Sequence, residues 1–379
     1  MDKINHFLNI IILLILALLS KLFLTNLINN ENYYISILGI IVTFSVGVYL
    51  IKKTANIIER TTAVLKRRTG LAGGLLQSFG TAFPDMVIGV VSALLSLQVA
   101  SSDPLKAVNL AIIAASTTFG SNIYNVFHAA WCVYRQNLAD KLNRNVLMFP
   151  KIKAGGTVTP ISMQEIKPSK REVDNSLIIL TFLSLLTTSV ALGMVIFGKI
   201  NDTPAGINGD LYQLNRPIGI VILVICITIL FTFRKTASEV NVDEGPNIYS
   251  HFSTILIWVE LLFAAAIILL AAESLVEAVV KFSEITKIPF VISGVFTGIV
   301  GCLSEIIVIH NFTIHPKGRL SDAIIGIAMD NIVTTMGASF IAVLGGIFLG
   351  SDALIIIFVL ILFGNTVLMQ QISTLRNHL

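Results

Sequence analysis

Ten stretches of the sequence are each long and apolar enough to cross a lipid bilayer as a helix. They run roughly over residues 7–26, 34–51, 71–99, 107–133, 175–198, 216–233, 252–276, 289–310, 322–348 and 353–371. A straight crossing needs about 20 residues, and several stretches, notably the third and fourth, are longer, so we expect such segments to be tilted or broken. Only 13% of all residues are charged, whereas 55% are hydrophobic. The sequence therefore predicts an all-α polytopic membrane protein whose partner is the lipid bilayer.

The composition also limits the classes of function. It excludes a soluble dinucleotide-binding enzyme, and a net charge of +4 is too small to indicate a nucleic-acid partner. Cys132, Cys226 and Cys302 lie far apart in apolar stretches without CxxC spacing, so we expect buried thiols rather than a disulfide or a zinc site. We expect His128 and His310, near inner span ends, to be interfacial or packing residues. Nothing in the sequence indicates an organic cofactor, a catalytic residue or an oligomeric state.

The distribution of basic residues sets the direction of the helices. With a cytoplasmic N-terminus, 20 of the 26 Lys and Arg residues fall in segments on the cytoplasmic side, as the positive-inside rule requires. We therefore expect both termini in the cytoplasm and, because no transit peptide is evident, the plasma (inner) membrane of a prokaryote. The stretch 7–26 could instead be a signal peptide. No A-x-A cleavage pattern follows it and Lys21 interrupts its end, so we expect a retained helix.

The two halves of the chain contain matching blocks. Aligning Asp85 with Glu305 pairs GTAFPD with VGCLSE, and each block is followed by a span with a small, polar centre, ASTTFGSNIYN or IAMDNIVTT. The predicted topology makes span 71–99 run outward and span 289–310 run inward, so the repeats are inverted. Inverted repeats that meet at polar residues near the bilayer midplane are typical of secondary transporters.

These repeats define the expected organisation of the chain. Residues 1–33 form an extra N-terminal transmembrane helix, residues 34–233 the first repeat half, and residues 234–379 the second. Within these halves we expect a first repeat region over 71–134, a cytoplasmic loop over 134–174 and a second repeat region over 289–348.

Three acids lie inside predicted spans: Asp85, Glu305 and Asp330. An ionised carboxylate at the bilayer centre costs about 2.5–3.5 kcal/mol, and these spans contain no Lys or Arg to offset that cost. Bound cations or protons are the expected partners. Pro84 removes a helical hydrogen bond beside Asp85 and frees a carbonyl near Thr81. A carboxylate beside free carbonyls is the ligand set of hard cations such as Na⁺ and Ca²⁺.

Further oxygen donors lie on the neighbouring spans: Ser121, Asn122, Asn125, Asn331, Thr334 and Thr335. An alternative interpretation is that these residues only pack helices together, and that each acid is protonated or hydrogen-bonded to Ser and Thr. Acids at matching positions of both repeats favour an ion site.

The blocks resemble the two alpha-repeats of the cation/calcium exchanger superfamily, which includes the sodium/calcium exchangers. Repeats of that family read like G-T-S-L-P-E followed by G-N-x-x-G-S-N-x-x-N, and GTAFPD with GSNIYN matches them closely in the first repeat. The second repeat is more divergent, with GCLSE and DNIVTT. Ala82 and Cys302 occupy positions where family members usually carry Ser. The resemblance implies a membrane fold of about ten helices in two inverted repeats, similar to that of sodium/calcium exchangers.

The resemblance also implies a role for each aligned residue. Asp85 and Glu305 would be the central ligands, Thr81 and Gly301 backbone-carbonyl donors, and Ser121 and Asn125 side-chain ligands of the first repeat. Their counterparts in the second repeat would be either Asp330 and Asn331 or Asn331 and Thr335.

We therefore expect a secondary active cation antiporter that exchanges Ca²⁺ for Na⁺ or H⁺ by alternating access, with these cations as its cargo and no enzymatic activity. Proton coupling is physically as easy as sodium coupling when carboxylates lie close together. A cation channel and a degenerate, non-transporting homologue are alternatives, the latter because of the divergent second repeat. An intramembrane aspartyl protease is disfavoured, because Asp85 lacks a G-x-G-D context and a YD partner.

Overall fold

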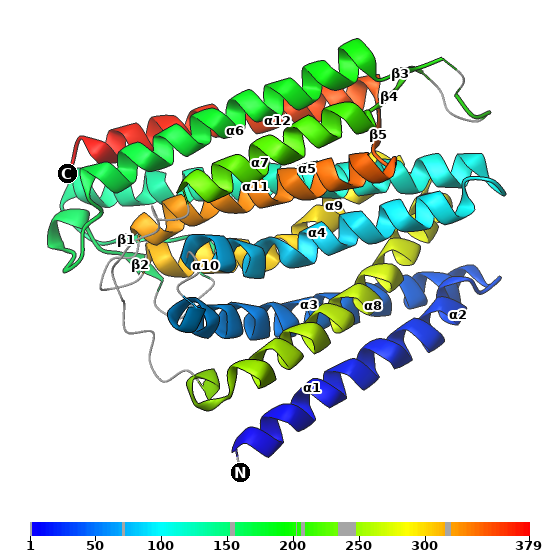
Figure 1. The fold of residues 1–379 in the computed structure, drawn as a ribbon, viewed down its shortest axis with the longest axis horizontal. Coiled ribbons are helices and arrows are strands. Elements are labelled where there is room, and N and C mark those ends of the chain that lie inside the picture. Colours follow the sequence, from blue (N-terminus) through cyan, green and yellow to red (C-terminus); the bar gives the residue numbers. More distant parts are fainter. Residues whose placement is uncertain are drawn as a thin grey trace.

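The computed structural model of the chain is a bundle of long helices (Figure 1). It describes residues 2–69, 73–151, 156–201, 203–205, 209–233, 248–314 and 320–379. In Figure 1 the chain begins at the bottom of the picture, and its C-terminal residues lie at the left-hand end of the bundle. We call this the terminal end and the opposite one the far end.

The helices are α1 (Asp2–Leu19), the π-helical turn η1 (Ser20–Leu24), α2 (Thr25–Ile28), α3 (Tyr33–Thr69), α4 (Gly73–Val99), α5 (Pro104–Leu142), α6 (Lys170–Phe197), α7 (Arg216–Phe233), α8 (Thr254–Thr286), α9 (Phe290–Gly301), α10 (Leu303–Thr313), α11 (Leu320–Leu344) and α12 (Ser351–Arg376). Two 3₁₀ turns are η2 (Ile161–Met163) and η3 (Ile248–His251). The strands are β1 (Val146–Leu147), β2 (Thr157–Val158), β3 (Lys199–Ile200), β4 (Leu211–Gln213) and β5 (Phe348–Gly350).

The helical membrane fold expected from the sequence is confirmed. Within the described residues, eight spans are long and apolar enough to cross a membrane, and the bent pair α9 and α10 gives a ninth. The helices α1 and α2 with the turn η1 form the first of these spans. The helix α5 corresponds to the remaining expected crossing and lies in the same bundle (Figure 1). Its centre is rich in buried polar side chains, which lowers its hydropathy.

One helix extends well beyond its apolar stretch. α3 continues past the predicted span 34–51 to Thr69, because the charged segment after residue 51 is amphipathic. One face of that segment, with Thr54, Ile58 and Leu65, is buried in the bundle. Burial of this face stabilises the extra turns even though the opposite face is basic.

The predicted cytoplasmic loop 134–174 is shorter than expected, because α5 continues to Leu142 and α6 already begins at Lys170. The end of α5 is polar, so its low hydropathy does not indicate that the helix continues there. Gln136 and Asn137 are nevertheless buried, and each donates a hydrogen bond to a backbone carbonyl of a neighbouring segment. Buried polar side chains with partners can therefore continue a helix inside the bundle.

Small antiparallel sheets join the loops at each end of the bundle. At the far end, β4 pairs with both β3 and β5, with Leu211 opposite Gly350, and this links the α6–α7 connection to the α11–α12 connection. At the terminal end, β1 pairs with β2. The sequence did not predict these strands, since two or three residues are too few to show an alternating pattern.

The two repeats cross the bundle in opposite directions, as the sequence predicted. The helix α4 runs from the terminal end to the far end, whereas α9 and α10 run back (Figure 1). The helices α5 and α11 are reversed in the same way. Because α4 packs against α5 and α11, and α5 packs against α9, the repeat helices form the centre of the bundle.

The break in a repeat helix occurs in the second repeat and not in the first. The helix α4 is continuous through Pro84, although that long span was expected to be tilted or broken. In contrast, α9 ends at Gly301 and α10 begins at Leu303, with a bend of 48° between them. A proline is tolerated within a membrane helix when its neighbours support the backbone, and the break in the second repeat falls beside Gly301, where a side chain would meet Asp85.

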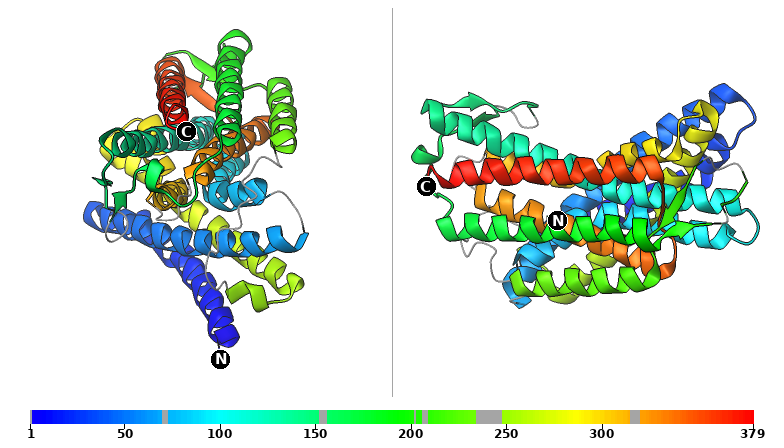
Figure 2. Two further views of the ribbon diagram at one scale, coloured as in Figure 1. Left: turned by 90° about the vertical axis from the view of Figure 1, so that its left-hand side faces the viewer. Right: turned by 90° about the horizontal axis from the view of Figure 1, so that it is seen from above.

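The N-terminal helix packs on the outside of the bundle, mainly against α8 (Figure 2). Lys21 Nζ lies 2.6 Å from Glu273 Oε2. The Thr25 hydroxyl donates a hydrogen bond of 2.8 Å to Glu277 Oε2. Two acidic residues of α8 therefore anchor this helix near the far end.

Candidate cation-binding site

Asp85 is fully buried in α4, which packs against α5 and α9. The Ser121 hydroxyl of α5 donates a hydrogen bond to Asp85 Oδ2. Gly301, the last residue of α9, packs directly on this acid. A Cβ atom placed on Gly301 would lie 2.6 Å from Asp85 Oδ1 and 3.0 Å from Asp85 Cα. The absence of a side chain at Gly301 therefore leaves the room that the carboxylate occupies.

Glu305 is fully buried in the first turn of α10, directly after the helix break. The Asn125 amide donates a hydrogen bond to Glu305 Oε2. The partial positive charge at the start of a helix favours a carboxylate in its first turn. Ser121 and Asn125 are four residues apart on α5 and so lie on one face of that helix. One face of α5 thus contacts both acids, one from each repeat.

Each acid keeps one carboxylate oxygen without a hydrogen-bond partner, Oδ1 in Asp85 and Oε1 in Glu305. The side-chain oxygens of Asn122 and Asn125 are also buried without a partner. Within the described part of the chain, neither acid forms an ion pair. An ionised carboxylate without a countercharge is costly in a low-dielectric interior. This arrangement can therefore accept a cation or a proton.

Asp330 and Asn331 lie on α11, which packs against α4 and α10. Asp330 is almost fully buried and, like Asp85, acts electrostatically on Glu305. Asn331 is fully buried, and neither its Oδ1 nor its Nδ2 atom has a hydrogen-bond partner. The Thr335 hydroxyl donates to the Asn331 carbonyl at 2.8 Å within the same helix. Asp330 with Asn331 therefore combines an electrostatic effect on Glu305 with unpartnered amide atoms, whereas the Thr335 hydroxyl already has a partner.

The structure therefore brings together most of the residues singled out from the sequence. Direct contacts join Asp85 to Ser121 and Gly301, and Glu305 to Asn125. Thr81 precedes Asp85 by one turn of the continuous helix α4, and its side chain lies outside the described residues.

Close packing of α9 on α5 was not anticipated from the sequence. A Cβ atom placed on Gly298 would lie 2.8 Å from the Thr117 carbonyl oxygen, and one on Gly294 would overlap the Ser116 side chain. The Thr117 hydroxyl donates a hydrogen bond of 3.1 Å to the Gly294 carbonyl. The G-x-x-x-G spacing of Gly294 and Gly298 is the sequence signal that identifies such a close helix contact. This packing holds the helix break against the polar face of α5.

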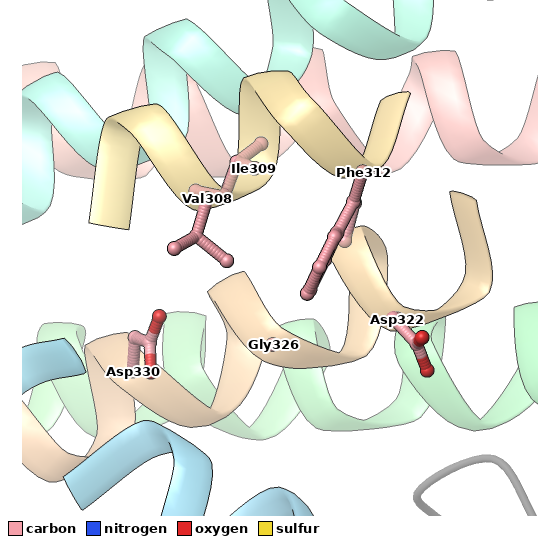
Figure 3. A pocket seen from close by; sticks show the side chains of 7 residues that line it. Val308, Ile309, Phe312, Asp322, Gly326 and Asp330 are labelled. Atoms are coloured by element: carbon pink, nitrogen blue, oxygen red, sulfur yellow. The ribbon is translucent and has the colours of Figure 1, made fainter. Parts of the chain in front are cut away.

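Small cavities lie between the buried acids and the terminal end. One lies between α10 and α11 (Figure 3), with Asp330 at one end, Asp322 at the other and the Phe312 ring between them. A second cavity, of about 120 Å³, lies between α3 and α10, and its lining includes Asn56 and Ser304. Ser304 directly precedes Glu305, so this second cavity reaches the start of α10.

Comparison with known proteins yields matches of fold. No protein-family model matches the chain, and no curated protein matches its sequence. The crystal structure of the H⁺/Ca²⁺ exchanger CAX matches with a TM-score of 0.58 and 14% identity, over 96% of this chain and 85% of that one. A structure of native YfkE matches with a TM-score of 0.54 and 11% identity, over 97% of this chain and 98% of that one. The chain has the fold of the cation/calcium exchangers.

This exchanger fold spans nearly the whole chain and confirms the resemblance seen in the repeat blocks. A structure of the selenium-substituted Ca²⁺/H⁺ antiporter protein YfkE matches with a TM-score of 0.54 and 13% identity, over 98% of this chain and 97% of that one. The sodium-calcium exchanger NCX_Mj is less similar, with a TM-score of 0.44 and 13% identity over 88% of this chain and 96% of that one. Among these structures, those of CAX and YfkE match with a TM-score above 0.5, and they show a shared fold.

Proposed function

We propose that this protein is a secondary active antiporter that exchanges Ca²⁺ for protons by alternating access. One observation carries the proposal. Two fully buried acids, Asp85 and Glu305, come from inverted repeats, contact the same face of α5, and each keep one oxygen without a partner. Such a pair requires neutralisation, and the repeats that carry it can move relative to each other.

The ligand chemistry favours a hard divalent cation. Ca²⁺ takes six to eight oxygen ligands at about 2.3–2.6 Å, from carboxylates, amide oxygens and carbonyls. Asp85, Glu305 and Asp330 supply carboxylate oxygens, and Asn125 supplies an amide oxygen that has no other partner. The backbone near the break at Gly301 is the expected source of further carbonyl oxygens. A divalent ion also balances two carboxylates, whereas Na⁺ balances only one.

Protons are the better candidate for the exchanged ion. Ala82 and Cys302 carry no side-chain oxygen at positions where members of the resembled family usually carry Ser, so this chain would have fewer ligands for separate Na⁺ sites. CAX and YfkE, which share its fold, are described as an H⁺/Ca²⁺ exchanger and a Ca²⁺/H⁺ antiporter. Protons and Ca²⁺ would then compete for the same carboxylates, which is the simplest basis for coupled exchange. Exchange for Na⁺ is the alternative.

Proton release on Ca²⁺ binding tests this competition. When Ca²⁺ is added to purified protein in weakly buffered detergent near neutral pH, we expect a pH-indicator dye to report released protons, and added Na⁺ to leave the Ca²⁺ affinity unchanged. Asp85→Asn should lose this release. Asp352→Asn, which changes an exposed acid at the start of α12, is the matched control and should retain it. Ca²⁺ binding that releases no protons and is displaced by Na⁺ would instead identify a sodium-coupled exchanger.

The cavity beside Asp330 provides a further prediction about access. Because the Phe312 ring lies between Asp330 and Asp322 (Figure 3), Phe312→Ala should open a path from the terminal end to the site. A cysteine introduced by Gly326→Cys on this cavity should then react several-fold faster with a membrane-impermeant thiol reagent. The control is Phe340→Ala, since Phe340 is an exposed side chain on α11, the helix that carries Gly326. Equal labelling rates in the two variants would show that Phe312 does not limit access.

We further propose that the protein resides in the plasma (inner) membrane of a prokaryote with the terminal end in the cytoplasm. The connection between α5 and α6, which carries several basic residues, lies at that end (Figure 1). The positive-inside rule then orients the whole bundle. Under this orientation the cavities beside Asp330 and Ser304 face the cytoplasm.

A further inference from the structure

A second group of metal-ligating side chains lies beside the helix break, apart from the carboxylates. His128 and Cys132 are on α5 and His310 is on α10. The potential ligand atoms of the three side chains all lie within 4.8 Å of one another. Cys132 Sγ is 3.5 Å from His128 Nε2, and the rings of His128 and His310 are stacked with centroids 5.7 Å apart.

We infer that His128, Cys132 and His310 form a binding site for a borderline-soft transition-metal ion, with Zn²⁺ as the expected occupant. His128 and Cys132 are four residues apart and therefore project from one face of α5. His310 approaches the same point from the second repeat. The sequence alone predicts no zinc site, because His128 and Cys132 supply only two neighbouring ligands and only the fold brings His310 of α10 against α5.

The state of His310 independently points to a ligand. Its side chain is fully buried, and neither ring nitrogen has a hydrogen-bond partner. Buried polar groups in proteins are nearly always satisfied by a partner, a water molecule or an ion. Cys132 is also fully buried, whereas His128 is partly exposed.

The donor atoms distinguish this site from the carboxylate site. Two imidazoles and a thiolate suit Zn²⁺ and other transition metals, whereas Ca²⁺ and Na⁺ select oxygen ligands. Zinc bonds of about 2.0–2.3 Å place tetrahedral ligand atoms about 3.3–3.6 Å apart. The His128–Cys132 separation of 3.5 Å already meets this requirement. His310 needs to move closer by about 1 Å, and a water molecule can complete the fourth position.

A metal ion bound here would join the two repeats. His128 lies one turn beyond Asn125 on α5, and His310 lies on α10 with Glu305. The ion would therefore hold α10 against α5, beside the contact between Asn125 and Glu305. Binding converts the Cys132 thiol to a thiolate and releases that proton to solvent.

Metal binding can be tested on the purified, metal-stripped full-length protein in detergent. We expect Co²⁺ to bind in a 1:1 ratio and to give a thiolate-to-metal charge-transfer band that Zn²⁺ abolishes and excess Ca²⁺ does not. Cys132→Ser should remove the band, and His310→Gln should weaken binding by about tenfold or more. Cys226→Ser is the matched control, because Cys226 is an equally buried free thiol on α7, and it should keep the band. A band that persists in Cys132→Ser, or that excess Ca²⁺ removes, would overturn the inference.

A measurement on the unmodified chain covers the case in which a variant fails to fold. Under mildly destabilising conditions, Zn²⁺ should slow alkylation of Cys132 and leave alkylation of Cys226 unchanged. Mass spectrometry of the peptides that contain these residues measures both rates. Zn²⁺ should also raise the apparent Tm, because an ion that binds only the folded state stabilises it. Equal alkylation of Cys132 with and without Zn²⁺, together with an unchanged Tm, would contradict the site.

The consequence for transport rests on the proposed function. If α10 moves relative to α5 during exchange, bound Zn²⁺ should slow Ca²⁺ flux in the unmodified protein and in Cys226→Ser, but not in Cys132→Ser. Zn²⁺ binding without this slowing would show that the ion does not restrain α10 against α5 during transport, and it would leave the metal site itself supported. Absence of any flux would count against the antiporter proposal, whereas the spectroscopic and alkylation results do not depend on it.

Discussion

Glu305→Gln is expected to reduce gradient-driven Ca²⁺ transport by about 100-fold or more while leaving the fold intact. Glutamine has nearly the same shape as glutamate, so the packing at the start of α10 is preserved. It removes the negative charge and exchanges one carboxylate oxygen for an amide group. Because the loss of even an outer partner of a metal ligand weakens binding by about 10–100-fold, the loss of a direct carboxylate ligand should have at least that effect.

The result can be separated from a general effect of removing acidic residues. Glu284→Gln changes a half-exposed acid on α8, whose carboxylate lies 3.8 Å from Lys281 Nζ. Surface ion pairs of this kind contribute about 0–1 kcal/mol, so this variant should transport normally. Both proteins should elute alike in size-exclusion chromatography and unfold at similar temperatures. Transport by Glu305→Gln at a rate close to that of Glu284→Gln would show that Glu305 does not hold the ion.

Gly301→Ala is expected to destabilise the protein and weaken Ca²⁺ binding. The new methyl group would lie 2.6 Å from Asp85 Oδ1 and 3.0 Å from Asp85 Cα, so either α9 or α4 has to shift. Inserting one carbon into a well-packed interior typically costs about 1–3 kcal/mol. If the shifted carboxylate loses a similar amount of binding energy, affinity falls by about tenfold or more, since 1.4 kcal/mol corresponds to one factor of ten.

Another glycine of the repeat helices provides the control for this substitution. A Cβ atom placed on Gly326 in α11 meets nothing within 4 Å. Gly326→Ala should therefore be neutral or slightly stabilising, because alanine favours the helix by up to about 1 kcal/mol. Thermal unfolding in detergent and Ca²⁺ titration measure both effects. Equal Tm and affinity for the two variants would contradict the close contact between Gly301 and Asp85.

The membrane-spanning segments and the central acids were predictable from the sequence. A helix in lipid satisfies its own backbone hydrogen bonds, so hydropathy alone reveals most spans. Acids inside such spans are costly, which makes Asp85 and Glu305 conspicuous among the apolar residues around them. The resemblance to the exchanger repeats implied that Ser121 and Asn125 lie beside these acids, and the structure shows one hydrogen bond from each to an acid.

Other features depend on tertiary contacts that the sequence does not reveal. Pro84 indicated a break in the first repeat, yet α4 is continuous there and the bend occurs next to Gly301. The extension of α5 to Leu142 depends on partners for its polar side chains from distant segments. The cluster with His310 forms only because α10 packs on α5.

Transport by the reconstituted protein tests the central claim most directly. The measurement is uptake of radiolabelled Ca²⁺ into proteoliposomes under an outward proton gradient, an outward Na⁺ gradient or no gradient. We predict uptake that the proton gradient drives above the level without a gradient, that the Na⁺ gradient does not drive, and that Glu305→Gln abolishes. Uptake that no gradient stimulates, or that is unaffected by Glu305→Gln, would contradict an antiporter built on these buried acids.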